Sequence, residues 1–190
     1  MKKFKEYAAP TVVLLIICVV AALLLAITND VTAPKIAEVN KANEEKSRQE
    51  VFVDAASFGE ETVINNKEIS ENEIKLVPAL DKNGEIIGYV ALTVEKGYGG
   101  AVSVMTGVDL EGKVTGVNIL SMSETPGLGA NATKASFLQQ FIGKIAGMTV
   151  TKNTPAENEI KALTGATITT KAVTAAVEAA ITAAGGENIG

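Results

Sequence analysis

Residues 84–122 read GEIIGYVALTVEKGYGGAVSVMTGVDLEGKVTGVNILSM. Runs rich in Val, Ile and Leu alternate with small or polar residues, and glycine-containing breaks at 97–100 and 110–113 separate them. Such alternation is typical of strands that bury one face, and the breaks are typical of turns. With a further turn at 82–84, the pattern predicts an antiparallel β-meander over residues 72–122.

Two segments of this region share a pattern. Residues 81–88 (DKNGEIIG) and 109–116 (DLEGKVTG) have Asp, Gly, an apolar residue and Gly at the same offsets. An internal repeat explains this likeness, and so do two similar hairpins that use the same turn chemistry.

Helical periodicity follows the meander and predicts an α+β fold with helices packed on the sheet. Residues 131–143 place Phe137, Leu138, Phe141 and Ile142 on one face, with Asn131 or Thr133 as the expected cap.

A last helix is expected over about residues 167–184, rich in alanine and ended by Gly185-Gly186. Its predicted apolar stripe consists of Ile168, Val173, Val177, Ala180 and Ile181.

The N-terminal region predicts a single membrane anchor. Residues 8–27 carry no charge and include TVVLLIICVVAALLLAI, and about 20 residues at ~1.5 Å each span a hydrocarbon layer of ~30 Å. Basic residues at 2, 3 and 5 precede the span, whereas the first basic residue after it is Lys35. The positive-inside rule therefore predicts a cytoplasmic N-terminus in the cell membrane and an extracytoplasmic location for everything after residue 28.

A cleaved signal peptide is the alternative for this segment. The apolar stretch is longer than the usual ~7–15 residues, and Ala26-Ile27-Thr28 is a poor cleavage site, so a retained anchor is favoured. Cys18 lies in mid-span and is interpreted as a membrane-buried thiol rather than a lipid attachment site.

The remaining chain divides at a change of composition. After the cytoplasmic N-terminus and transmembrane anchor (1–28), residues 29–52 are polar and charge-mixed, with Asp30 and Thr32 ahead of Pro34 as helix-start signals. We expect a largely solvated helical stalk there, with a partner surface as the alternative, and an extracytoplasmic domain over residues 53–190.

The composition of the chain limits the chemistry that its own side chains can perform. The chain of 190 residues has no His, no Trp and one Cys, which excludes intramolecular disulfides and thiolate-ligated clusters. Redox chemistry must then come from an organic cofactor or a partner. A net charge of −5 argues against nucleic acid as a partner.

Three glycine-containing motifs are candidate binding elements. Residues 164–170 (TGATITT) put hydroxyls at the expected start of the last helix, where free N–H groups and the helix dipole favour a phosphate. Residues 123–129 (SETPGLG) form a rigid loop suited to a flat ring or ribityl chain, although an ordinary strand-to-helix connection explains them too. Residues 97–100 (GYGG) are either a plain hairpin break or a similar element, and the lone Glu124 is a poor candidate base.

The order of these motifs carries a family resemblance. GYGG, SETPGLG, a helix containing FLQQF and then LTGATITT, behind an N-terminal anchor, resemble the covalent FMN-binding domain of membrane electron-transport complexes. The likeness is greatest to the G subunit of the Rnf complex and extends to the C subunit of the sodium-pumping NADH:quinone oxidoreductase. It is weakest over residues 50–75.

The resemblance implies a flavin site. Thr167 would be esterified to the FMN phosphate, Thr164, Gly165 and Ala166 would form the loop recognised by a flavin transferase, and Leu163 would be a neighbouring wall. Glu124, Thr125, Leu128 and Gly129 would line the isoalloxazine or ribityl side, with Tyr98 near the ring. The family often has Ser at the position of Thr164, which keeps the hydroxyl. No catalytic residue and no metal ligand is expected in this chain.

The resemblance also implies a function. The chain would relay electrons through FMN in a complex that couples electron transfer between ferredoxin and NAD to Na⁺ or H⁺ movement, and it would not be catalytic alone. The other Rnf subunits, the flavin transferase and membrane lipid would be its partners.

Two other classes of protein fit parts of the sequence. A pilin-like protein would explain Glu6 before a long apolar helix, but the processing site ahead of that Glu is missing and the glycine motifs are left unexplained. An anchored FMN-binding sensor not coupled to an ion pump is the second alternative.

Overall fold

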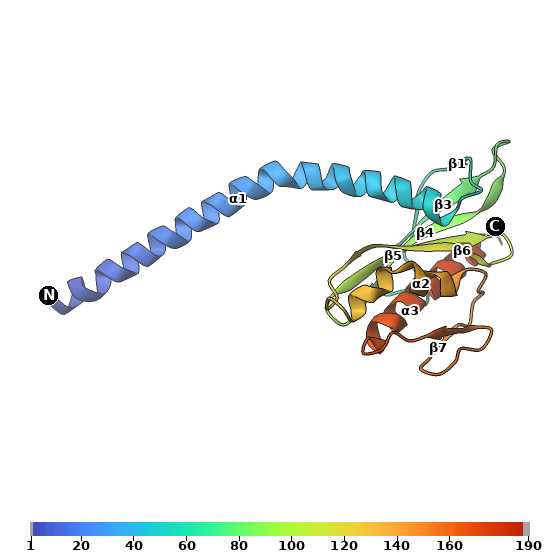
Figure 1. Cartoon of the computed structure of the whole chain (residues 1–190). Helices are drawn as coiled ribbons and strands as arrows, with labels where there is room; N and C mark the ends of the chain where they lie inside the picture. The colour runs from blue at the N-terminus through green and yellow to red at the C-terminus, as the bar shows by residue number, and fades with distance from the viewer. Residues whose placement is uncertain (1, 188–190) are drawn as a thin grey trace. The chain divides into compact units, whose positions relative to one another are not determined.

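A computed structural model describes residues 2–187. The chain separates into two compact units, with the boundary between Asn43 and Glu44. Helix α1 (Lys2–Val51) is continuous across this boundary (Figure 1). The last two turns of the predicted stalk therefore belong to the same unit as the sheet.

The expected helix start near Asp30 and Thr32 is wrong. Pro34 lies inside α1 rather than at its first turn. The Thr32 hydroxyl does not cap a helix but donates to the carbonyl of Thr28, 2.8 Å away, as is common for threonine inside a helix.

The predicted β-meander is confirmed. Its four long strands pair in sequence order, all antiparallel, and two short strands pair with the outer edge of the first. In chain order the sheet consists of β1 (Ser57–Phe58), β2 (Thr62–Ile64), β3 (Ile74–Leu80), β4 (Ile86–Lys96), β5 (Ala101–Asp109) and β6 (Val114–Met122).

Two hairpin turns explain the similar segments 81–88 and 109–116. Asp81 Oδ1 accepts the N–H of Asn83 and of Glu85, and Asp109 Oδ1 accepts the corresponding N–H groups at the next hairpin. The N–H donated by Glu85 is the largest of the effects that hold the pKa of Asp81 below its ordinary value. The glycine of each turn, Gly84 or Gly112, has positive φ.

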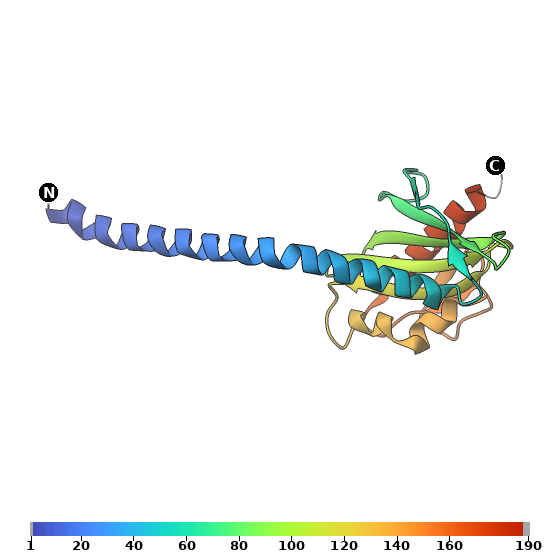
Figure 2. The same cartoon turned by 90° about the horizontal axis from the view of Figure 1, so that it is seen from above.

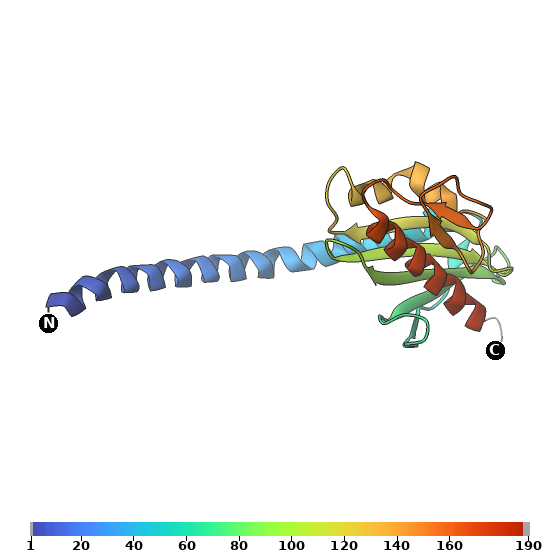
Figure 3. The same cartoon turned by 90° about the horizontal axis from the view of Figure 1, so that it is seen from below.

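One face of the sheet is covered by α3 (Thr167–Glu187), which packs on β4 and β5 (Figure 3). Alternate residues of β5 share this core with the helix, because side chains on a strand alternate between faces. The small alanine side chains of α3 allow the helix to pack close to the sheet. The predicted glycine stop is wrong, because α3 continues through Gly185 to Glu187. Ile168 is also not part of the buried stripe, since its side chain is 53% exposed.

The opposite face of the sheet is covered by the end of α1, which the sequence did not predict (Figure 2). Val51 and Phe52 are buried there with Met105. The backbone of α1 comes so close that a Cβ on Gly116 would lie 2.7 Å from Val51 Cα. The second glycine of the 109–116 segment thus makes room for a helix, not for a turn.

The expected helix over 131–143 is replaced by three short pieces. These are η1 (Gly129–Thr133), α2 (Ala135–Leu138) and η2 (Gln139–Phe141). Neither proposed cap acts as one: Asn131 Nδ2 donates to the carbonyl of Gly127, and the Thr133 hydroxyl to that of Ala130.

The apolar face of this segment is confirmed in part. Phe137 and Phe141 are buried and meet edge to face with ring centroids 5.5 Å apart. Ile142, expected on the same face, is 53% exposed because η2 ends before it.

A second small sheet lies just before α3. It consists of β7 (Thr149–Thr151) and β8 (Glu159–Lys161), which pair in parallel. The C-terminal ends of both strands therefore point toward the loop that leads into α3.

Candidate flavin site

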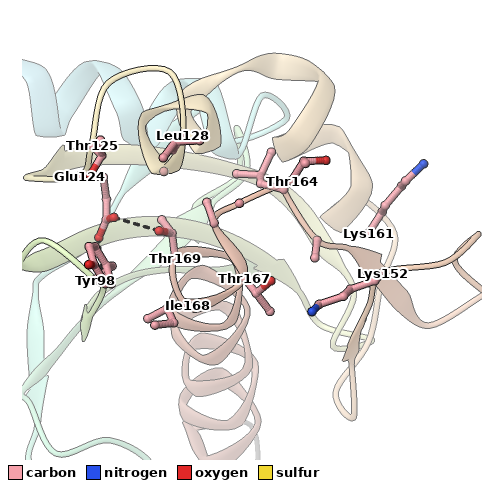
Figure 4. Close-up of a pocket in the computed structure, with 15 residues that line it drawn as sticks. Tyr98, Glu124, Thr125, Leu128, Lys152, Lys161, Thr164, Thr167, Ile168 and Thr169 are labelled. Carbon is pink, nitrogen blue, oxygen red and sulfur yellow. Dashed lines mark hydrogen bonds between the residues drawn. The ribbon is translucent and has the colours of Figure 1, made fainter.

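A pocket of about 810 Å³ lies at the start of α3, where the loops that follow β4, β6 and β8 meet (Figure 4). All ten site residues predicted from the sequence line it, and five others line it with them. The predicted residues are Tyr98, Glu124, Thr125, Leu128, Gly129, Leu163, Thr164, Gly165, Ala166 and Thr167; the others are Lys152, Lys161, Ala162, Ile168 and Thr169.

The segment 163–166 is a tight turn that ends where α3 begins. The Ala166 N–H donates to the carbonyl of Leu163 at 3.0 Å, and Gly165 at the third position has a φ of +75°. A turn of this kind needs a residue that tolerates positive φ. A Cβ at Gly165 would also come within 3.1 Å of Leu128. Gly165 therefore allows the two predicted loops to lie close together.

The Thr170 side chain fixes the turn from inside the helix. Its hydroxyl accepts the N–H of Leu163 and donates to the carbonyl of Ala166. Thr170 is fully buried, so these bonds are not open to competition from water. The result is a rigid entry to α3.

Thr167 is the first residue of α3 and is half-buried. Within residues 2–187 its hydroxyl has no hydrogen-bond partner, and neither do the backbone N–H groups of Thr167, Ile168 and Thr169. Free N–H groups at a helix start, together with the positive end of the dipole, attract an anion. A free hydroxyl thus lies at a site that favours a phosphate.

Glu124 connects three parts of the pocket wall. Oε1 accepts the N–H groups of Tyr98 and Gly99 at 2.8 and 3.1 Å, and Oε2 accepts the Thr169 hydroxyl at 2.9 Å. The side chain is nearly buried, and glycines at 97 and 129 leave it room, since a Cβ at either would lie within 2.5 Å of its oxygens. The structure therefore assigns Glu124 a positioning role that the sequence did not suggest.

The pocket has an apolar rim as well as a polar end. Tyr98, Leu128 and Ile168 line it while remaining 72%, 44% and 53% exposed. Tyr98 and Leu128 come from two separate loops, and Ile168 comes from the first turn of α3. Exposed apolar groups gathered around a pocket are typical of a ligand site.

Two lysines in the pocket were not predicted. Lys152 follows β7 and Lys161 ends β8, and neither forms an ion pair with an acid in the part of the chain that the structure describes. The sequence spacing of these lysines did not predict that they line the pocket. Parallel pairing of β7 with β8, rather than a local sequence motif, brings them to the start of α3. Thr169, by contrast, lies within the TGATITT motif, and its helical position relative to Thr167 was available from the sequence.

The described residues contain no group of three His, Cys, Asp or Glu side chains placed to hold a metal ion. The carboxylate of Glu124, which lines the pocket, accepts the Thr169 hydroxyl instead.

Comparisons with known proteins define the class first. Residues 97–182 match the family model of the FMN-binding domain, and residues 1–51 match that of the RnfG N-terminal region. The fold agrees with crystal structures of NqrC from Shewanella oneidensis (TM-score 0.56, 19% identity, 73% of each chain) and of the C subunit of the Na⁺-translocating NADH-quinone reductase from Parabacteroides distasonis (TM-score 0.57, 19% identity, 77% of this chain and 92% of that one). This is an FMN-binding domain fold behind an apolar N-terminal helix.

Curated relatives identify the family. The G subunit of the Na⁺-translocating ferredoxin:NAD⁺ oxidoreductase complex from Acetobacterium woodii is 41% identical over 89% of this chain and 87% of its own length. The G subunit of the proton-translocating complex from Clostridium ljungdahlii is 37% identical over 88% and 86%. The chain belongs to the family of G subunits of ion-translocating ferredoxin:NAD⁺ oxidoreductase complexes, the Rnf complexes. The resemblance inferred from the sequence is confirmed.

The pocket fits FMN chemically. A free hydroxyl and free N–H groups lie at the start of α3, which suits a phosphate. The exposed apolar side chains of Tyr98, Leu128 and Ile168 lie at the rim, suited to a flat ring. The described residues can therefore hold both the charged and the aromatic part of the cofactor.

Proposed function

We propose that Thr167 carries FMN as a phosphoester and that this chain relays electrons within an ion-translocating ferredoxin:NAD⁺ oxidoreductase complex. The observation that carries the proposal is the free Thr167 hydroxyl at the first residue of α3, beside free N–H groups and inside a pocket that suits FMN. FMN supplies the redox chemistry when bound. The chain's own residues hold its phosphate, orient its ring and shield it from water.

Attachment would use FAD and a flavin transferase with a divalent metal. The Thr167 Oγ–P bond forms, the P–O bond within the FAD pyrophosphate breaks, and AMP leaves with the electron pair of that bond. The hydroxyl proton is released to the solvent. Thr164 and Gly165 are exposed beside Thr167, so this turn can be reached by the transferase.

Thr167→Ala tests the attachment. Full-length protein is coexpressed with a flavin transferase, denatured and examined for flavin fluorescence on the separated band. We expect wild type to fluoresce and T167A to be dark, because the ester oxygen is missing. Thr182→Ala is the matched control: it removes an exposed threonine hydroxyl from the same helix and should keep full fluorescence. A dark wild-type band would refute the proposal.

The membrane arrangement is part of the same proposal. Helix α1 has one stretch long and apolar enough to cross a membrane, and the basic residues before it favour a cytoplasmic N-terminus. Residues 1–28 would be the cytoplasmic N-terminus and the anchor that crosses the cell membrane, with lipid around the membrane-spanning part. Residues 29–52 would be the stalk and 53–190 the extracytoplasmic FMN domain. A reporter fused after residue 50 should be active only outside the cytoplasm; activity inside would reverse this topology.

Membership in the G-subunit family favours this function over a free-standing FMN sensor. Relatives of this length are named as subunits of complexes, so the other subunits are the proposed partners. Copurification of the tagged chain with those subunits would support the relay, and a chain recovered alone from its native membrane would favour the sensor.

A further inference from the structure

We propose that Lys152 is the cationic partner of the phosphate that joins FMN to Thr167, and that Lys161 is not. This inference rests on the attachment proposed above. Both lysines line the pocket, and both lack an acidic partner within the described residues. What separates them is the direction in which each side chain points.

Strand register explains that difference. Thr151 and Lys161 are paired across the parallel strands β7 and β8, so their side chains lie on the same face. The pairing continues for one step, because the Ala162 N–H donates to the carbonyl of Thr151 at 2.7 Å. Lys152, one residue beyond Thr151, is therefore directed to the opposite face. Figure 4 shows the Lys152 side chain extending toward Thr167 and that of Lys161 extending away from it.

The backbone around Lys152 is held in place. The Asn153 N–H donates to the Thr151 hydroxyl at 3.2 Å, which forms a turn around Lys152. The Ala156 N–H donates to Glu159 Oε2 at 2.8 Å, and the Lys161 N–H donates to Gln140 Oε1 at 2.8 Å. These bonds fix the backbone at both ends of the segment that connects β7 to β8. The Lys152 backbone therefore has a defined position, from which the ammonium group can reach the start of α3.

Charge balance supports one lysine at the phosphate. The phosphodiester at Thr167 carries a single negative charge, and the helix start supplies a partial positive charge. The Lys152 ammonium, a compact cation on a flexible side chain, neutralises the remaining negative charge of the phosphodiester. Before transfer, the FAD pyrophosphate carries two negative charges at the same place. The same ammonium would then help to seat the phosphoryl group that Thr167 receives while AMP departs.

The test compares three variants of the full-length protein in detergent: Lys152→Gln, Lys152→Arg and Lys161→Gln. Apo protein is mixed with purified flavin transferase, FAD and Mg²⁺, and the initial rate of covalent labelling is measured by in-gel flavin fluorescence. K152Q should lower the rate about tenfold, the size expected for loss of one charge-assisted contact. K152R should recover most of the rate, and K161Q, with the same change of net charge, should remain near wild type.

A second measurement separates a phosphate contact from docking of the transferase. The ³¹P NMR signal of the phosphodiester is recorded for flavinylated wild type, K152Q and K161Q, each labelled to completion and freed of transferase. K152Q should shift this signal because the ammonium beside the phosphate is lost, while K161Q should leave it unchanged. Thr167→Ala, put through the same treatment, should give no protein-bound ³¹P signal.

The outcomes are distinct. Slow labelling of K152Q alone, with a shifted ³¹P signal in labelled K152Q, supports the proposal. Equal slowing of K152Q and K161Q, no slowing of K152Q, or the same ³¹P signal in K152Q and wild type overturns it. In each of these cases wild type is still labelled, so attachment at Thr167 stands. A wild type that takes no flavin refutes the attachment itself.

Discussion

At the scale of single residues, the pocket depends on one carboxylate. Glu124 accepts two backbone N–H groups and one hydroxyl, and it thereby joins the loops at 97–100 and 123–129 to the start of α3. Glu124→Ala removes the acceptor of all three bonds and leaves the buried Thr169 hydroxyl without a partner, at a cost of about 3 kcal/mol. For a chain of this size that lowers Tm by roughly 6–12 °C. Thermal unfolding in detergent measures the change.

Two further variants make this prediction specific. Thr169→Val removes only the hydroxyl donor and should lower Tm by roughly half as much, since one charge-assisted bond is lost. Glu111→Ala is the control, because Glu111 is exposed in a hairpin turn and its side chain forms no bond that a truncation would remove in the described structure. If E124A unfolds at the same temperature as E111A, Glu124 does not hold the loops together.

At the scale of elements, the sheet is shaped by glycines that admit a helix. Gly107 and Gly116 are paired across β5 and β6, and the Val51 carbonyl lies over both of them. Gly116→Ala would place its Cβ 2.7 Å from two backbone atoms of Val51, so the end of α1 must move. Overpacking of this kind costs about 1–3 kcal/mol, and we expect a Tm lower by roughly 2–12 °C.

Gly185→Ala is the matched control for this substitution. Gly185 lies within α3, and nothing lies within 4 Å of a Cβ added there. Alanine is the better helix former, so the free energy of unfolding should be unchanged or rise by up to ~1 kcal/mol. Similar losses of Tm in G116A and G185A would show that the cost belongs to glycine replacement in general and not to the α1 contact.

The same elements show what could be predicted from the sequence. The meander and its turns were predictable because alternation and Asp–Gly turns are local signals. The grouping of TGAT, SETPGLG and GYGG at one pocket came from the family resemblance. The sequence did not predict the packing of α1 on the second face of the sheet or the parallel β7–β8 pair, and therefore did not predict Lys152. Contacts between distant segments leave no periodic pattern in the sequence. The prediction of one helix over residues 131–143 was wrong because Phe137 lies in α2 and Phe141 in η2. Tertiary packing, rather than helix propensity, stabilises these short elements.

At the scale of the whole molecule, the last turns of α1 contribute to the stability of the domain. Val51 and Phe52 are buried against the sheet, Thr115 donates to the Val51 carbonyl at 2.7 Å, and Asn118 donates to Ser47 and Glu50. Burying two such apolar side chains contributes roughly 1.5–3 kcal/mol each. The sum, about 3–6 kcal/mol, is a large share of the roughly 5–15 kcal/mol that stabilises a typical domain.

Two truncations test this contribution. Residues 44–190 should fold as a soluble domain that accepts flavin, because this unit retains the whole interface. Residues 53–190 should have a free energy of unfolding lower by about 3–6 kcal/mol, or aggregate through the exposed sheet face, as measured by urea unfolding of both. Phe52→Ala within 44–190 is the control for the apolar share and should account for about 3 kcal/mol or more. Equal urea midpoints for the two truncations would show that the end of α1 adds nothing to the domain, and the stalk would then be only a tether.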